Sequence, residues 1–164
     1  MAFTTLGTVA PGDVLRANSG TAAYNNVIGN VRNAPRGLVG TPAISSFTSG
    51  VAVTTSVADS GLSISVPMIA GRNYLMIASG ELSSGGANVT VTLFVTDGSN
   101  TQLTLQATNI PNAGVRQLAS VRYIETAAAT GTVTRKIRAS ASTNSTLAAA
   151  ADRPWQFYVM DLGA

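Results

Sequence analysis

Strict alternation of apolar and polar side chains is the feature that most constrains what this sequence can fold into. In NVTVTLFVT (88–96), every second residue from Val89 to Val95 is valine or leucine. Successive side chains of an extended strand point to opposite faces, so these residues would share one face. The turn sequence DGSN (97–100) and the run TQLTLQA (101–107) follow directly, which predicts a β-hairpin.

Similar runs recur along the chain, bounded by Gly, Pro or Asn. We expect further strands near residue 45 and at 51–57, 62–66, 73–79, 115–125, 131–141 and 155–162. Strands at this spacing predict an all-β fold, with a jelly-roll-like antiparallel β-sandwich as the first choice and an immunoglobulin-like sandwich as the second. Two alanine-rich patches, 126–131 and 146–152, are too short to stand as helices, so we interpret them as loops.

Two of the expected strands are apolar on both faces. NYLMIAS (73–79) has this pattern, and the last strand carries Trp155 and Phe157 on one face with Tyr158 and Met160 on the other. Such strands lie in the centre of a core or at a subunit interface. The sandwich therefore has more apolar faces than one core needs, which favours a homotrimer whose protomers cover the surplus.

The front of the chain follows a different pattern. Residues 1–20 are rich in Gly, Pro, Thr and Ser and predict an extended arm. From 21 to 33 the apolar residues recur at i, i+3, i+4 and i+7, which predicts one short helix that ends before Pro35. The apolar stripe of this helix consists of Tyr24, Val27, Ile28 and Val31.

This short helix needs a surface to fold on. A helix of about eleven residues is marginal in water even with an ideal composition, and this one contains several asparagines and Gly29, which lower helix propensity. Its stripe has to be buried either against its own sandwich or on another protein, and the sequence leaves both alternatives open. We divide the chain into an N-terminal arm and short anchoring helix at 1–37 and a β-sandwich domain at 38–164.

Composition excludes most enzyme chemistry. The 164 residues include no Cys and no His, so Cys–His and Ser–His–Asp triads and the usual zinc sites cannot form. No pair of acidic residues stands out as a glycosidase pair, and we expect neither an enzyme nor a cofactor. Charged residues make up only 10% of the chain, against roughly 25% in an ordinary domain. A surface with so few charges favours broad contacts with other subunits, the alternative being a soluble monomer with a threonine-rich surface.

The sequence also limits the compartment and the class of partner. No run approaches 18 apolar residues, so no membrane span is expected. The first residues lack the pattern of a signal peptide, so we expect synthesis in a cytoplasm. The net charge of +3 comes from cations that do not form a run, and because no nucleic-acid motif accompanies them, nucleic acid is not an expected partner.

A basic group lies in the second half of the chain. It consists of Arg116, Arg122, Arg135, Lys136 and Arg138. In strand alternation Lys136 and Arg138 share one face while Arg135 points the other way. The group is interpreted either as solvated strand faces and charge-protected edges or as a contact with an acidic partner. A sugar-stacking role for Trp155 or Tyr123 is a separate, lectin-like interpretation.

Four segments together carry a resemblance. GTVAPGDVLRANSGTAAYNNVIGNVR is similar to the N-terminal segment of many tailed-bacteriophage accessory structural proteins, in which an arm leads to a short Asn-rich helix ending in Val-Arg. The segments SVPMIAGRNYLM, VRYIETAAATGTVTRKIRASA and RPWQFYVMDLGA resemble parts of small phage β-sandwich domains. The resemblance implies a virion protein, a homotrimer that sits on the capsid as a decoration protein or on the tail as a minor tail or fibre subunit.

Together these observations predict a non-enzymatic virion structural protein made in the host bacterial cytoplasm. Its N-terminal segment would dock on the major capsid protein or on tail proteins, and its sandwich would project outward. The candidate partner-binding residues are Tyr24, Val27, Ile28, Val31, Arg32, Arg135, Lys136 and Arg138. The alternative is a receptor- or carbohydrate-binding module of a tail fibre. Attachment to head or to tail stays open.

Overall fold

The computed structural model describes residues 39–163, and these fold into ten β-strands without a helix. In chain order the strands are β1 (Val39–Phe47), β2 (Val51–Val53), β3 (Ala58–Met68), β4 (Asn73–Ser83), β5 (Val89–Asp97), β6 (Gln102–Ile110), β7 (Arg116–Thr126), β8 (Gly131–Ala141), β9 (Ser145–Ala148) and β10 (Trp155–Gly163). The predicted arm at 1–20 and the predicted helix at 21–33 lie outside the described residues.

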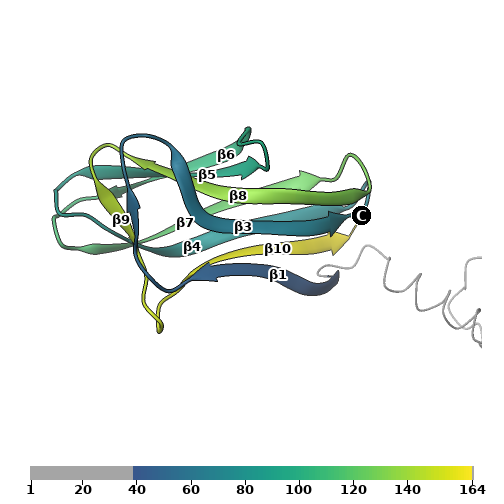
Figure 1. Ribbon diagram of the computed structural model, residues 1–164, viewed down its shortest axis with the longest axis horizontal. Helices are drawn as coiled ribbons and strands as arrows, with labels where there is room; N and C mark the ends of the chain where they lie inside the picture. The colour runs from purple at the N-terminus through teal and green to yellow at the C-terminus, as the bar shows by residue number, and fades with distance from the viewer. Residues whose placement is uncertain (1–38, 164) are drawn as a thin grey trace, which may run out of the picture.

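The strands form two antiparallel sheets packed face to face (Figure 1). The long strands of the first sheet, sheet A, run in the order β1-β10-β4-β7, and the short strands β9 and β2 extend it beyond the end of β10. Sheet B has the order β3-β8-β5-β6. Eight long strands in two four-stranded sheets, with crossovers between the sheets, make a jelly roll. The first of the two expected sandwiches is therefore confirmed.

The core lies between the two sheets and is built from the alternation seen in the sequence. β4, β5 and β10 each present every second side chain to the interior. The largest fully buried side chains are Trp155, Tyr74, Phe157, Leu62, Met68, Met76, Leu82, Leu93, Ile110, Ile137 and Leu147. Each large apolar side chain buried here stabilises the fold by about 1.5–3 kcal/mol.

Trp155 shows how tightly this core is packed. Its ring stacks on Phe47 with the centroids 6.4 Å apart, and its indole N–H donates a hydrogen bond to the carbonyl oxygen of Glu81 at 2.7 Å. The ring lies directly over Gly80, where a Cβ atom would come within 2.2 Å of it. Only glycine leaves room for the indole at this position of β4.

The structure corrects several strand boundaries. Only Val51–Val53 of the expected strand 51–57 is extended, and β4 continues four residues past 79 because it pairs with β7 as far as Ser83. The patch 146–152, interpreted as a loop, contributes most of β9. There Leu147 is buried between Leu82 and Val51 on the neighbouring strands, so tertiary packing decides the conformation where local propensity is weak.

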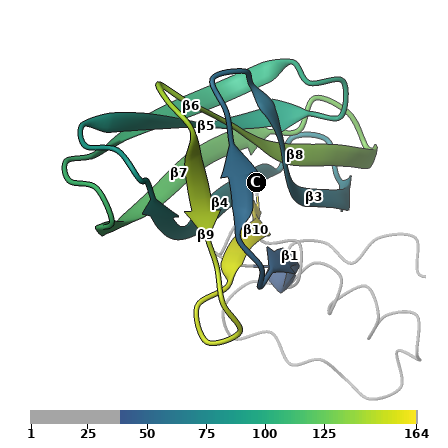
Figure 2. The ribbon, with the colours of Figure 1, turned by 60° about the vertical axis from the view of Figure 1, so that its left-hand side comes forward.

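Both ends of the described chain meet at one end of the sandwich. Val39 of β1 pairs with Asp161 of β10, while β2 and β9 lie together at the opposite end (Figures 1 and 2). The segment that precedes Val39 therefore joins the sandwich at the end of sheet A where the last strand, β10, finishes.

Candidate interaction surface

Two neighbouring rows of mainly apolar side chains cross the outer face of sheet A and together involve all four long strands, whereas the rows toward β9 are mostly polar and include the Glu81–Arg116 ion pair. Strand register places Ile44, Tyr158 and Ile77 in one row, and Met160, Leu75 and Ile124 in the next. These side chains point away from the core, because the residues between them on β4 and β10 face inward and are buried. We call Ile44, Leu75, Ile77, Ile124, Tyr158 and Met160 the sheet A patch.

Exposure within the sheet A patch is greatest at its two edges. Ile44 on β1 is 57% exposed and Ile124 on β7 is 59% exposed, whereas the members on β4 and β10 are half-buried between their neighbours. A shallow depression of about 570 Å³ crosses the β4–β7 side of the patch. Arg122 is the one charged residue in the two rows, opposite Ile77. Contiguous apolar patches on a protein surface mark contacts with other molecules.

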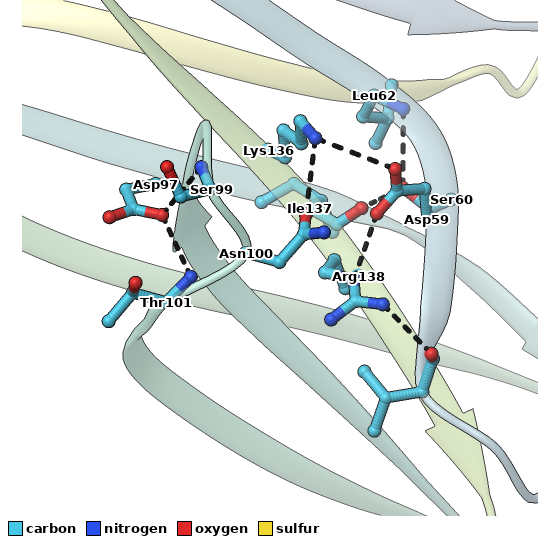
Figure 3. Close-up of polar contacts among 11 residues, drawn as sticks. Asp59, Ser60, Leu62, Asp97, Ser99, Asn100, Thr101, Lys136, Ile137 and Arg138 are labelled. Carbon is cyan, nitrogen blue, oxygen red and sulfur yellow. Dashed lines mark hydrogen bonds and ion pairs between the residues drawn. The ribbon is translucent and has the colours of Figure 1, made fainter.

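The outer face of sheet B is mostly polar, apart from the paired Phe94 and Leu105 on β5 and β6, and its charged side chains form ion pairs with one another. The guanidinium of Arg138 donates to the Asp59 carboxylate at 2.9 Å and to the carbonyl oxygen of Val57 at 3.0 Å (Figure 3). The Lys136 ammonium lies 3.7 Å from the same carboxylate and donates to the side-chain oxygen of Asn100 at 3.2 Å. These ion pairs join β3 to β8 and leave the face without an apolar patch of comparable extent.

The turn between β5 and β6 adds to this polar face. The carboxylate of Asp97 accepts hydrogen bonds from the backbone N–H groups of Thr101 and Ser99 at 2.8 and 2.9 Å (Figure 3). Those hydrogen bonds, the one from Thr101 above all, lower the pKa of Asp97. The turn signal DGSN thus works as expected, with Asp97 fixing the turn.

The predicted partner-binding cations fall into two groups. Lys136 and Arg138 do share the outer face of sheet B, and Arg135 faces inward as the alternation implies. Arg135 is buried and forms a two-pronged ion pair with Glu125 of β7, with N–O distances of 2.9 and 2.5 Å. It ties sheet B to sheet A and is not part of an outer surface of the single chain. The helical stripe and Arg32 lie outside the described residues.

Two of the motifs that carry the resemblance meet in space. In the segment AGRNY, Gly71 has a positive φ of 79° and Arg72 forms an ion pair with Asp161 of the terminal DLG at 3.0 Å. The hydroxyl oxygen of Tyr74 accepts a hydrogen bond from the N–H of Ile69 at 2.9 Å. Burial, and next the charge of Asp161, raise the pKa of Tyr74. These contacts fix the end of the sandwich where β1 begins, so we assign the motifs a structural role.

The carboxylates of the described residues are occupied by hydrogen bonds or cations. The pairs are Asp59 with Lys136 and Arg138, Glu81 with Arg116 and Arg153, Glu125 with Arg135, Asp152 with Arg153, Asp161 with Arg72, and Asp97 with its own turn. The hydrogen bond from Arg116, at 2.7 Å, lowers the pKa of Glu81. In this part of the chain, no three His, Cys, Asp or Glu residues are grouped so that they could hold a metal ion, and no helix is long and apolar enough to cross a membrane.

The lectin-like interpretation of Trp155 is wrong, because its ring is fully buried in the core. Tyr123 is half-buried on the inner side of β7. A polar groove of about 440 Å³ does run between the edge strands β6 and β7, lined in part by Thr104, Gln106, Thr108, Ser120 and Arg122. Its hydroxyl and amide groups could hydrogen-bond a polar ligand, although no aromatic ring lines it.

The sequence indicated that some strands have two apolar faces, but not that the second faces would lie together on the outer side of sheet A. The signal was the two-faced pattern of 73–79 and of the last strand. These segments became β4 and β10, which are neighbours in sheet A, so their second apolar faces combine into one patch. The contributions of Ile44 and Ile124 carried no comparable signal, because the outer positions of their strands are a mixture of apolar and polar residues.

Comparison with known proteins adds structural likeness only. No protein-family model matches the sequence, and no curated protein matches it. Among solved structures, chains of the infectious bursal disease virus Gt and Gx strains match with TM-scores of 0.41 and 0.40, at 11% and 10% identity over 75% and 76% of this chain. The VP2 subviral particle of the same virus matches with a TM-score of 0.36 at 10% identity over 75% of this chain. This chain spans 38% of the length of each of those chains.

Proposed function

We propose that this protein is a non-enzymatic structural protein of a phage virion that works through contacts with other protein subunits. The observation that carries the proposal is the sheet A patch, an apolar surface four strands wide on a sandwich whose core is already complete. Apolar patches larger than a few hundred Å² are uncommon on monomers and often mark protein–protein contacts. The low charge content of the chain, 10%, suits the same role.

In this proposal residues 1–37 anchor the protein and residues 38–164 project from the virion as a homotrimer. The anchor would use the stripe Tyr24, Val27, Ile28 and Val31, with Arg32 at its end, on the major capsid protein or on a tail protein. The position of Val39 supports this division, because the anchor would leave the sandwich at one end, away from β2 and β9. Lys136 and Arg138 remain candidates for a weaker contact with an acidic neighbour.

Such a protein would act mechanically, after synthesis in the host cytoplasm. Each copy buries low-charge surface against several neighbours, and the linked contacts reinforce one another through avidity. As a decoration protein it would raise the stability of the capsid shell. As a tail subunit it would hold neighbouring parts together.

Deleting residues 1–37 tests the anchor. The full chain and the deletion variant are mixed with undecorated shells and, separately, with tails, and binding is measured by co-sedimentation. We expect the full chain to bind one of the two particles and the deletion to abolish binding while circular dichroism still reports a β-sandwich. Undiminished binding of the deletion variant would reject the anchor, and failure of the full chain to bind either particle would reject the virion role.

A substitution pair sharpens this test. Val27→Asp and Ile28→Asp place charges on the stripe, whereas Asn26→Asp places the same charge on the other side of the predicted helix. We expect at least a roughly 30-fold loss of particle binding for the stripe variants, as for a hot-spot residue. Asn26→Asp should bind nearly as well as the unchanged protein.

The polar groove between β6 and β7 keeps the carbohydrate-binding alternative open. In that case the purified protein would adhere to host cells, a soluble sugar would displace it, and Gln106→Ala would weaken adhesion. Adhesion that neither sugar nor this substitution affects would remove the alternative.

A further inference from the structure

We propose that the sheet A patch is the contact surface between copies of this chain, with three sheets A facing one another around a threefold axis. This inference rests on the homotrimer of the proposed function and names the surface that would form it. It commits to a second copy as the occupant of the patch, and the chain's own N-terminal stripe is the competing occupant.

The size of the sheet A face favours a second copy. Four strands about 4.8 Å apart, each about ten residues long at about 3.3 Å per residue, present an area of roughly 600 Å². A stable protein interface buries about 800 Å² on each partner, so the face approaches that size. A helix of 13 residues is about 20 Å long and about 10 Å wide, and would cover roughly a third of the face.

The chemistry of the face also favours a copy of the same chain. Its central rows contain six apolar side chains and one cation, Arg122, with no carboxylate. These two rows resemble the apolar centre of homo-oligomer interfaces, and the polar remainder of the face, which includes the Glu81–Arg116 ion pair, would form the rim. On the outer face of sheet B, by contrast, the single Asp59 carboxylate is shared by Lys136 and Arg138, so the cluster keeps a net positive charge that suits an acidic neighbour.

The distribution of exposure fits a closed ring of three. When three sheets face a common axis, the β1 edge of one copy meets the β7 edge of the next, a head-to-tail contact that closes after three steps. The most exposed apolar side chains of sheet A lie on those two strands: Ile44 on β1, and Ile124 and Leu118 on β7, the last 72% exposed. Ile44 and Ile124 belong to neighbouring rows, so they would approach each other across the contact.

The absence of cysteine from the sequence allows a clean cross-linking test. The full chain carrying both Ile44→Cys and Ile124→Cys is treated with a short bifunctional maleimide and run on a denaturing gel. We expect covalent trimers as the largest product. The matched control carries Ile44→Cys with Leu105→Cys on β6, where Leu105 is 48% exposed on the outer side of sheet B. The control should give no covalent trimer.

Single lysine substitutions supply a second measurement. Sedimentation velocity compares Ile124→Lys with Leu105→Lys in the full chain, and circular dichroism checks that both are folded. Both positions are exposed in the single chain, so both variants should fold. We expect Ile124→Lys to weaken association at least about 30-fold, and Leu105→Lys to leave it unchanged.

Each contrary result overturns a defined part of this inference. Covalent dimers without trimers would replace the threefold ring by a twofold pair. A monomeric chain whose Ile124→Cys thiol is protected from reagents would show that its own N-terminal segment covers the patch. A trimer that Ile124→Lys leaves intact would place the interface elsewhere, yet the virion role would stand if particles still bind. Cross-linked trimers that bind no particle would instead support this inference and reject the virion role.

Discussion

The two outer faces of this sandwich are built from the same kind of strand but have opposite surfaces. Sheet B shows serine and threonine hydroxyls and ion pairs, such as the 2.8 Å hydrogen bond between Ser65 and Thr134. Sheet A shows isoleucine, leucine, methionine and tyrosine across four strands. The core needs only one apolar face from each sheet. The second apolar face of sheet A is therefore best explained by contact with another protein.

The salt bridge between Glu125 of β7 and Arg135 of β8 joins the two sheets inside the sandwich, so breaking it should have the largest effect on stability. Glu125→Ala leaves the buried guanidinium of Arg135 without its carboxylate, and we expect a loss of about 3–5 kcal/mol in the free energy of unfolding. Urea unfolding measures it. The double variant Glu125→Leu/Arg135→Met should recover most of the loss, and a single variant as stable as the unchanged protein would contradict this role.

Gly80→Ala tests the packing that holds sheet A in shape. The new Cβ atom would overlap the Trp155 ring, and overpacking of this kind costs about 1–3 kcal/mol. Thermal unfolding and tryptophan fluorescence would report the shift. The matched control is Gly85→Ala, in a loop where a Cβ atom would meet no neighbour within 4 Å, and an equal effect at both positions would argue against the packing explanation.

On sheet B, removing the charge of Asp59 should have a small effect. Its carboxylate side chain is 53% exposed, and exposed ion pairs contribute about 1 kcal/mol or less. Asp59→Asn should therefore change the free energy of unfolding by no more than that amount, and should not alter association. Loss of the oligomer in this variant would assign the interface to the wrong sheet.

The pH dependence should be the smallest effect. Folding lowers the pKa values of Glu81 and Asp97 from their ordinary values of 4.5 and 3.8. The stability that these two ionised carboxylates contribute is therefore fully present above pH 4.5, and it is lost as the pH falls through their lowered pKa values. The pKa of Tyr74 is raised from 10.0, so its contribution is present below pH 10.0 and is lost as the pH rises through the raised value.

Between pH 5 and 9 we therefore expect little change in stability, measured by thermal unfolding in a series of buffers. Association should be equally insensitive across this range, because the sheet A patch contains no carboxylate and the sequence contains no histidine. A steep change of either quantity near neutral pH would require an ionisable group outside the described residues.

Much of the fold could be predicted from the sequence because β-strand alternation is a local signal. The hairpin of β5 and β6 and the long strands β7, β8 and β10 lie close to their expected positions. β9 could not be predicted, since TLAAAA has little strand propensity and becomes extended only when Leu147 fills a gap beside Leu82. Gly80 carried no signal either, because its requirement arises from a tryptophan 75 positions away.

The candidate site was predictable only in part, because its residues come together through pairing between strands that are distant in the sequence. Strand alternation correctly separated Arg135 from Lys136 and Arg138, but it could not show that Glu125 would meet Arg135 across the sandwich. It indicated that two strands had spare apolar faces, but not that β4 and β10 would be neighbours. Pairing between distant strands decides which side chains gather on one surface, and no single segment contains that information.

The rates at which two matched cysteines react test the central claim most directly. In the full chain, Ile124→Cys on sheet A and Leu105→Cys on sheet B replace side chains that are 59% and 48% exposed in the single copy. At low protein concentration the Ile124→Cys thiol should react with a maleimide reagent at least as fast as the Leu105→Cys thiol. We predict that at high concentration only the sheet A thiol becomes protected, and equal reactivity of the two thiols at every concentration would contradict the account.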